Sequence, residues 1–265
     1  MRNLEAAIRR RRDEIFGMRR ELHRIPETAY EEEKTSACIA DRLRRLGVTV
    51  RAGIARCGVV GLQRFGPGGT TLMLRSELDA LPLAEQTGLA FASTRSGVMH
   101  ACGHDGHMAM VLGAAMVMGD LDPPLNGAVK YVFQPAEEGP GGAAPMIAEG
   151  VLEDPAVDAV LAFHLWPELP EGTVGVRSGP LMAAMDRFDL RIIGRGGHGA
   201  MPHRCVDALE IGAQVVGALQ RLVSRQINPL QAAVITVGAF HAGSAFNVIA
   251  DEACLCGTTR TFDLP

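Results

Sequence analysis

One stretch of twelve residues, 99–110, most constrains what this chain can fold into. Its sequence MHACGHDGHMAM places five potential metal-binding side chains within eight positions: His100, Cys102, His104, Asp105 and His107. An apolar run, 111–118, follows directly and predicts a buried helix. Polar ligands on a turn before a buried helix indicate a metal site in an α/β protein. The alternative is a polar loop with a helix-capping aspartate and locally hydrogen-bonded histidines, and the density of ligand types argues against it.

Composition indicates a globular protein and gives no sign of a polyanionic partner. The chain has 265 residues, 47% of them hydrophobic, and a net charge of −4. We therefore expect no nucleic acid and no membrane as a partner. The arginine run 9–12 lacks a following apolar segment, so no signal peptide is predicted. With scattered cysteines, we expect reduced thiols in the cytoplasm, and Cys254 and Cys256 are interpreted as packing residues on one strand.

Strand and helix patterns alternate through a first predicted domain, residues 1–182. Helices are expected over 3–24, 30–46, 111–118 and about ten residues ending at 150, and strands over 48–50, 59–62, 71–74, 127–133 and 158–164. A break is expected at 122–124, where Asp-Pro-Pro interrupts the chain. Alternation of strands with helices predicts an α/β fold with a mostly parallel mixed sheet.

The pattern changes in a second predicted domain, residues 183–265. A strand over 186–193, a helix over 208–222 and strands over 233–240 and 253–262 follow one another. This β-α-β-β order makes up three quarters of a ferredoxin-like α+β unit.

Ligand-type side chains lie at the ends of three of the predicted strands: Asp79, then Glu137 with Glu138, then His164. Carboxyl ends of parallel strands meet at one edge of a sheet, where open α/β folds carry their sites. Thiolate, imidazole and carboxylate together suit Zn²⁺, with Mn²⁺, Co²⁺ or Ni²⁺ as alternatives. Of two adjacent glutamates, one can bind the metal while the other acts as a general base on water.

Five motifs in order give the chain a resemblance to a known family. They are Leu78-Asp-Ala-Leu-Pro82, 99–107, the VFQPAEEG segment 132–139, the GGHGAMPH segment 196–203, and Asn247 with Arg260-Thr-Phe-Asp263. On these motifs the whole chain resembles the metal-dependent amidohydrolases and metallopeptidases that include hippurate hydrolase, N-acyl-amino-acid amidohydrolases and indole-acetyl-amino-acid hydrolases. The resemblance implies a zinc-peptidase-like catalytic domain with two divalent metal ions (Zn, Mn, Co or Ni). It also implies an inserted ferredoxin-like lid domain that forms a homodimer.

The same resemblance implies a role for each matching residue. The metal ligands would be Cys102, His104, Glu138 and His164, with Glu137 as general base and Asp79 orienting the site. His198 would polarise the scissile carbonyl of the partner's substrate, and Asn247 and Arg260 would bind the substrate carboxylate, which a guanidinium grips bidentately. Structural alternatives remain open: a turn residue for His198, a turn cap for Asn247 and a strand ion pair for Arg260. His107 and His100 are interpreted as lying behind the ligands and hydrogen-bonding their own loop, respectively.

The chain departs from the family pattern in two places. The family commonly shows Ala-Asp-Met-Asp where this chain has Ser76-Glu77-Leu78-Asp79, and the longer Glu77 can change the contacts behind the ligands. The family also continues beyond the equivalent of Pro265, with the last lid elements and a final histidine ligand that we expect this chain to lack. The predicted activity is hydrolysis of N-acyl or N-aroyl amino acids such as hippurate. The alternative is a catalytically impaired fragment that acts as a metal-binding or dimerisation module.

Overall fold

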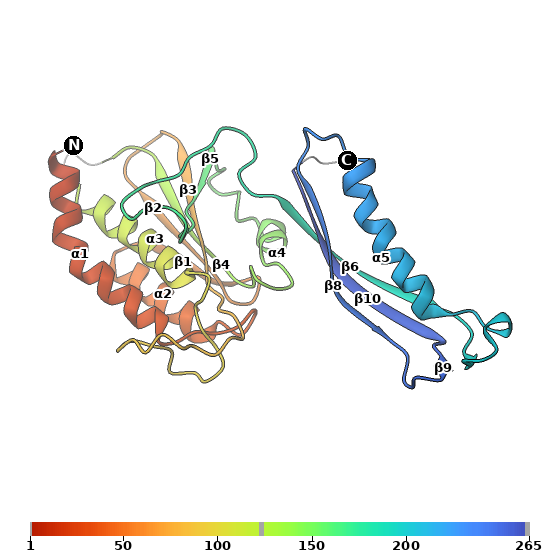
Figure 1. The fold of residues 1–265 in the computed structure, drawn as a ribbon. Coiled ribbons are helices and arrows are strands. Elements are labelled where there is room, and N and C mark those ends of the chain that lie inside the picture. Colours follow the sequence, from red (N-terminus) through yellow and green to blue (C-terminus); the bar gives the residue numbers. More distant parts are fainter. Residues whose placement is uncertain (1, 122–124, 263–265) are drawn as a thin grey trace. The chain divides into compact units, whose positions relative to one another are not determined.

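The computed structural model describes residues 2–121 and 125–262, and contacts divide the chain into two compact units, 1–168 and 169–265 (Figure 1). The predicted break at 122–124 and Asp263 of the last motif lie outside the described residues. The division at 168 precedes the boundary predicted at 182. The stretch between the two boundaries, all of it described, contains neither helix nor strand.

A five-stranded mixed sheet runs through the first unit, in the order β1-β2-β4-β3-β5. Its strands are β1 (Thr49–Ile54), β2 (Gly58–Arg64), β3 (Thr71–Glu77), β4 (Ala128–Gln134) and β5 (Ala159–Ala162). β3 runs parallel to both β4 and β5, whereas β2 is antiparallel to both β1 and β4. Three residues connect β1 to β2, and so short a connection allows only antiparallel pairing. The predicted parallel pairing is therefore confined to the β4-β3-β5 half of the sheet.

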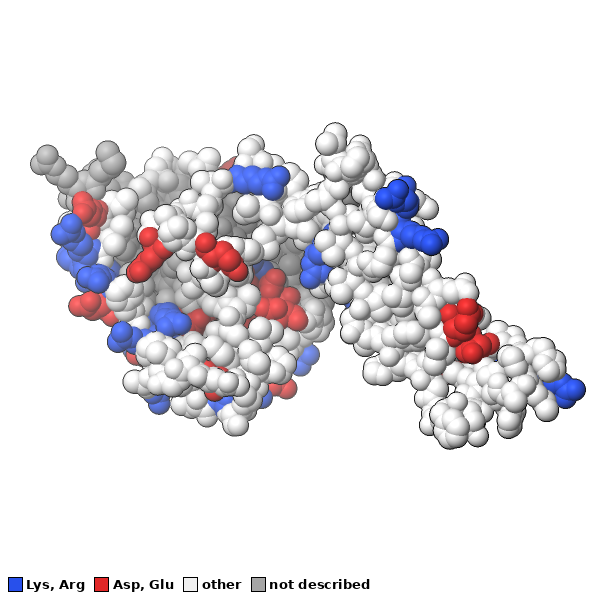
Figure 2. Space-filling model, viewed as in Figure 1, with Lys and Arg blue, Asp and Glu red and all other residues white. Residues whose placement is uncertain are grey.

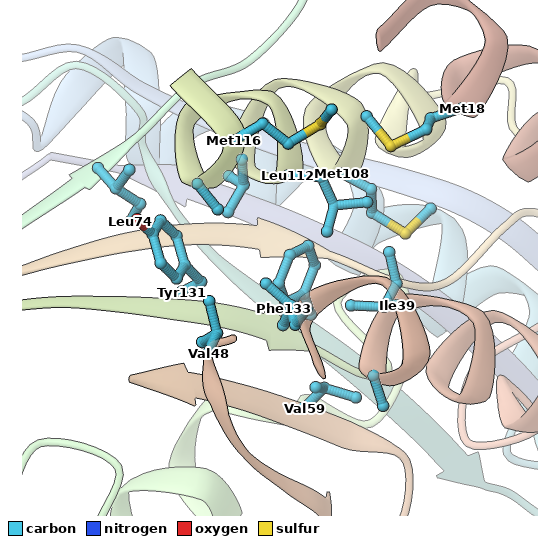
Figure 3. Packing of buried hydrophobic residues seen from close by; sticks show 14 of the residues in the cluster. Met18, Ile39, Val48, Val59, Leu74, Met108, Leu112, Met116, Tyr131 and Phe133 are labelled. Atoms are coloured by element: carbon cyan, nitrogen blue, oxygen red, sulfur yellow. The ribbon is translucent and has the colours of Figure 1, made fainter. Parts of the chain in front are cut away.

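Helices cover both faces of this sheet. α1 (Arg2–His23), α2 (Glu33–Arg45) and α3 (His104–Gly119) pack on one face, and α4 (Ala143–Ala148) packs on the other. Because side chains alternate along a strand, Tyr131 and Phe133 of β4 join the core under α1–α3, while Val132 joins the smaller core with Met146 of α4. Figure 3 shows Leu112 in the core with Phe133.

α3 begins at a glycine turn without a side-chain cap. Gly103 precedes it with φ +90°, a left-handed conformation that glycine adopts without steric cost. The alternative interpretation of Asp105 as a helix cap is therefore wrong: Asp105 lies inside the helix, and its carboxylate pairs with Arg19 and His23. Most of α3 is buried, which explains why its sequence after the first turn is apolar on all sides.

The second unit has the β-α-β-β order predicted from the sequence. β6 (Ala184–Ile193), β8 (Ala233–Ala242) and β10 (Glu252–Thr261) form an antiparallel sheet with β10 in the middle, and α5 (Ala208–Arg225) connects β6 to β8 through the loop that includes β7. Two short strands, β7 (Gly197–His198) and β9 (Val248–Ile249), pair separately. Ala253 and Leu255 of β10 are buried, and the intervening Cys254 is exposed on the opposite face. The interpretation of Cys254 as a packing residue is therefore wrong.

The surface of the first unit mixes both signs of charge. Figure 2 shows acidic and basic side chains interspersed over its visible face, as the net charge of −4 leads one to expect. Among the helices of the described ranges, none combines the length and apolar character required to cross a membrane.

The packing of α3 predicts a strong difference between two neighbouring substitutions. Leu112 is completely buried, so Leu112→Ala should lower the free energy of unfolding by about 2–5 kcal/mol through lost contacts and a residual cavity. Met110 on the same helix is 36% exposed, and Met110→Ala should change that free energy by about 0.5 kcal/mol. Urea unfolding curves measure both values. Equal losses would contradict the described packing.

Candidate metal centre

Five of the predicted site residues come together where β4 and β5 end and α3 begins. Cys102 and His104 lie at the turn into α3, Glu137 and Glu138 follow β4, and His164 follows β5. The ligand atoms of Cys102, His104 and His164 lie within 4.8 Å of one another, as do those of His104, Glu137 and Glu138. His104 belongs to both groups, so the two groups form one continuous cluster.

The distances between ligand atoms fit shared metal ions. Cys102 Sγ lies 3.4 Å from His164 Nε2, and His104 Nε2 lies 3.8 Å from Glu138 Oε1 and 3.9 Å from Glu137 Oε2. Metal–ligand bonds of about 2.0–2.3 Å in tetrahedral geometry place neighbouring ligand atoms about 3–4 Å apart. The donor set therefore suits a borderline divalent ion without large rearrangement.

Both candidate histidine ligands are held in the tautomer that a metal needs. His104 Nδ1 donates a hydrogen bond to the Asp79 carbonyl oxygen at 2.7 Å, and His164 Nδ1 donates to the Leu165 carbonyl oxygen at 2.7 Å. Nε2 is thereby the ring atom left for a metal ion in each case, and each Nε2 lies next to another candidate ligand. At metal sites, a hydrogen bond from the ring nitrogen that does not bind the metal fixes the orientation of the imidazole ring.

Asp79 stabilises the turn that carries the two glutamates. Its side chain is completely buried, and Oδ2 accepts the backbone N–H of Glu138 at 2.8 Å. Burial alone would raise the Asp79 pKa, but the His104 ring, whose Nδ1 lies 3.5 Å from Oδ1, and the Glu138 backbone N–H hold that pKa below its ordinary value. Asp79 therefore remains an ionised acceptor behind the cluster, and its predicted orienting role stays a prediction.

Glu32 contacts the same turn and has no counterpart in the sequence analysis. It is completely buried just before α2, and its Oε1 accepts the backbone N–H of Ala136 at 2.7 Å. Ala136 has φ +53°, a left-handed conformation that an alanine rarely adopts, so this hydrogen bond holds a strained residue in place. Glu32 lies far along the chain from every motif, and neither its spacing nor its neighbours indicated this contact.

The cluster of candidate ligands has an excess of negatively charged groups. Burial lowers the pKa of His104, but hydrogen bonds with Asp79 and Cys102 and the charge of Glu77 outweigh burial and raise it to about 11. Burial and the neighbouring charge of Glu138 raise the pKa of Glu137. Crowded carboxylates that favour a positive partner are the electrostatic environment in which a divalent cation is stabilised.

A further group of potential ligands, Glu77, His104 and His107, lies behind the cluster. His107 Nδ1 lies 2.9 Å from Glu77 Oε2, and His107 Nε2 accepts the Leu165 backbone N–H at 2.9 Å. Burial raises the Glu77 pKa, but the hydrogen bond from His107 and the charge of Arg75 lower it overall. Both ring nitrogens of His107 are engaged, which agrees with the interpretation that His107 lies behind the ligands.

The other predicted residues, His198, Asn247 and Arg260, belong to the second unit. His198 ends β7, and its Nδ1 accepts the Ala200 N–H at 3.1 Å, so the exposed Nε2 carries the proton. The Asn247 carbonyl oxygen accepts the Gly199 N–H at 2.8 Å, and this hydrogen bond joins the loop after β7 to the loop before β9.

Arg260 is exposed on β10 and donates to Thr258 and Thr259. In the described ranges Arg260 makes no ion pair, contrary to the structural alternative for it.

A second buried polar cluster lies beside the turn that carries Cys102 and His104. His23 Nδ1 lies 2.8 Å from Asp105 Oδ2, and His23 Nε2 lies 3.2 Å from Glu85. Arg19 also pairs with Asp105, at 2.7 Å.

His100 was expected to hydrogen-bond its loop, and this prediction is wrong. Neither ring nitrogen of His100 has a partner among the described residues. Burial lowers the pKa of His100 to about 4, so its ring is neutral near pH 7.

The His23 contacts predict a pH-dependent contribution to stability. The hydrogen bond with Asp105 outweighs burial and raises the His23 pKa above its ordinary value of 6.5. A raised folded-state pKa stabilises the fold below pH 6.5, and this contribution disappears as the pH rises through the folded-state value. The difference in unfolding free energy between the unaltered chain and His23→Gln should therefore shrink with rising pH. Urea unfolding at a series of pH values from below 6.5 to well above it measures the difference, and a constant difference would mean that the His23 pKa is the same in the folded and unfolded states.

Removal of the Asp79 side chain should weaken metal binding. Asp79→Ala frees the Glu138 N–H and should lower Zn²⁺ affinity by about 10–100-fold, the usual cost of losing a group that orients ligands. Asp158 is a matched control, because its carboxylate accepts the Thr71 N–H at 2.7 Å at the opposite end of β3. Asp158→Ala should leave Zn²⁺ affinity unchanged in competitive chelator titrations. Equal effects of the two substitutions would contradict the orienting role of Asp79.

Comparison with known proteins gives consistent matches. The family model described as peptidase family M20/M25/M40 matches residues 73–261. The N-acyl-L-amino acid amidohydrolase of Geobacillus stearothermophilus is 45% identical over 251 residues, 94% of this chain and 67% of that protein. The N-acetyl-L-cysteine deacetylase of Bacillus subtilis is 44% identical over 250 residues, 94% of this chain and 60% of that protein. The chain thus spans about two thirds or less of the length of these relatives.

A solved structure gives the same match in three dimensions. The Bacillus subtilis YXEP protein, a dinuclear metal-binding peptidase of the M20 family, superposes with a TM-score of 0.78 at 36% identity. The superposition covers 98% of this chain and 65% of that protein. The mixed α/β fold expected from the sequence is thereby confirmed.

Proposed function

The chain belongs to peptidase family M20/M25/M40, and we propose that it hydrolyses the amide bond of N-acyl or N-aroyl amino acids, releasing a carboxylate and a free amino acid. One observation carries the proposal: thiolate, imidazole and carboxylate ligands converge beside a further glutamate, Glu137, at the end of a buried strand. The N-acyl-amino-acid relatives support the substrate class.

We propose two divalent ions, of Zn, Mn, Co or Ni, as the cofactors of this site. Cys102, His104, Glu138 and His164 would hold them, and the ligand-atom distances described above support that assignment. When bound, such ions supply Lewis acidity and a strong oxygen nucleophile at neutral pH. Asp79 fixes the Glu138 backbone and the His104 ring relative to each other, because its carboxylate accepts the Glu138 N–H and its carbonyl oxygen accepts the His104 Nδ1–H.

Glu137 would move the proton. Its Oε2 lies 3.9 Å from His104 Nε2, and its side chain remains 40% exposed, so it can reach both water and substrate. As general base it would accept a proton from the attacking water, and it would then donate that proton to the leaving amine. Its neighbour Glu138 points a carboxylate at the same imidazole and is assigned to the metal.

The second unit would bind the substrate and close the site. A protonated Nε2 suits His198 for donating a hydrogen bond to the developing oxyanion. Arg260 suits bidentate binding of the substrate carboxylate. Asn247, which contacts the loop after His198 near the opposite end of β10, would be the second residue that binds it. In this proposal residues 183–265 form a lid domain that dimerises, so that His198 acts on the substrate of the partner copy. The catalytic residues would be Glu137 and His198.

Two adjacent substitutions separate the proposed roles. Glu137→Gln should lower kcat by about 10²–10⁴-fold because the proton carrier is lost, with metal content unchanged. Glu138→Gln should lose metal as well as activity. Hydrolysis of N-acetyl, N-benzoyl and indole-acetyl amino acids in the presence of each of the four metals, with metal content by atomic emission, measures both. An inactive unaltered protein on all substrates, or equal metal loss in both variants, would contradict the proposal.

A further inference from the structure

We propose that His107 is a positioning residue that holds the ligand His164 in place, and that Glu77 fixes the tautomer His107 needs. This inference rests on the proposed function, because His164 matters only if the cluster binds metal. It concerns two residues to which the proposed reaction gives no role. Both are almost completely buried, with Glu77 at 3% and His107 at 1% exposed.

The chain around His164 needs support beyond the sheet. β5 has four residues, and its pairing with β3 ends at Ala162, so the ladder no longer holds the backbone at His164. His107 supplies the next contact, because its Nε2 accepts the backbone N–H of Leu165 at 2.9 Å. The His107 and His164 rings also contact each other edge to face, with centroids 4.6 Å apart.

The Leu165 peptide is thereby held at both of its polar groups. Its N–H donates to His107, and its carbonyl oxygen accepts the hydrogen bond from His164 Nδ1 that leaves Nε2 free for a metal. The Leu165 side chain lies against the first turn of α3, where a Cβ built on Gly106 would stand 2.7 Å from Leu165 Cδ1. A shift of Leu165 would therefore rotate the His164 ring away from Cys102.

Glu77 makes His107 an acceptor. His107 Nε2 can accept the Leu165 N–H only if the ring proton resides on Nδ1. Glu77 Oε2 accepts a hydrogen bond from that Nδ1–H, with 2.9 Å between the nitrogen and the oxygen. Arg75 fixes Glu77 in turn: it pairs with the Glu77 carboxylate and donates to Gln134 Oε1 at 3.1 and 2.8 Å. The network therefore runs from the ends of β4 and β3 through α3 to the residue after His164.

Stability alone gives little reason for such a network. A buried ionic group is costly to desolvate, and apolar residues of similar volume often serve the fold equally well. Orientation of a ligand is a property that an apolar replacement cannot supply. The effect of substituting His107 or Glu77 on metal binding therefore distinguishes a positioning role from a purely structural one.

The first test is a double-mutant cycle on Co²⁺ binding. His107→Phe should weaken Co²⁺ binding by about 10–100-fold and change the Cys102 thiolate-to-cobalt absorption band in the direction that His164→Ala does. The double variant His107→Phe/His164→Ala should bind no more weakly than His164→Ala alone, because His107 acts through His164. Additive losses would overturn the proposal.

The second test replaces Glu77 in two ways and does not depend on the folding of His107→Phe. Glu77→Gln keeps an acceptor oxygen for His107 Nδ1 and should restore Co²⁺ affinity and spectrum to within a few-fold of the unaltered chain, whereas Glu77→Met should reproduce the His107→Phe loss. Ser76→Ala is the matched control: Ser76 is adjacent and buried, and its hydroxyl has no partner among the described residues.

The outcomes distinguish this inference from the proposed function. If Glu77→Met binds Co²⁺ like the unaltered chain, or if Glu77→Gln and Glu77→Met lose affinity equally, the positioning role of this pair is wrong while the metal centre stands. If the unaltered chain binds Co²⁺ without a thiolate band, the proposed metal centre itself is wrong. Metal-free thermal unfolding of each variant separates loss of fold from loss of ligand orientation.

Discussion

Parallel pairing of β3 with β4 and with β5 decides where every candidate ligand of the first unit lies. Glu77 is level with Gln134 and Arg75 is level with Ala162, so the three strands end within a few residues of one another. Whatever follows those ends must emerge at the same edge of the sheet. Ligand residues that are far apart in the sequence therefore meet there, and α3 supplies the remaining ones because its first turn begins at that edge.

The cluster owes its geometry to buried groups behind it. Asp79, Glu32 and the Glu77–His107 pair each accept or bridge a backbone N–H of a turn that carries a candidate ligand or base. These groups are almost completely buried, so water does not compete for their hydrogen bonds. The backbone that carries the side chains of the cluster is thereby fixed.

Much of this arrangement follows from the sequence, because strand ends and ligand types are local patterns. The convergence of Cys102, His104, Glu137, Glu138 and His164 was predicted in that way. Contacts that depend on tertiary packing were not. The antiparallel β2–β4 pair, the hydrogen bond from Ala136 to Glu32 and the unpartnered ring of His100 all depend on which elements meet in space. Residue spacing along the chain does not encode such meetings.

The burial of α3 links the donor geometry to the closure of the core. His104 is 2% exposed and is the first residue of a helix that is apolar on all sides after its first turn. That helix is stable only once α1 and the sheet cover it, since isolated helices of its length are marginal in water. The complete donor geometry therefore requires a closed core. Selection among the proposed ions would then depend on the donor types and geometry that this closed core holds in place.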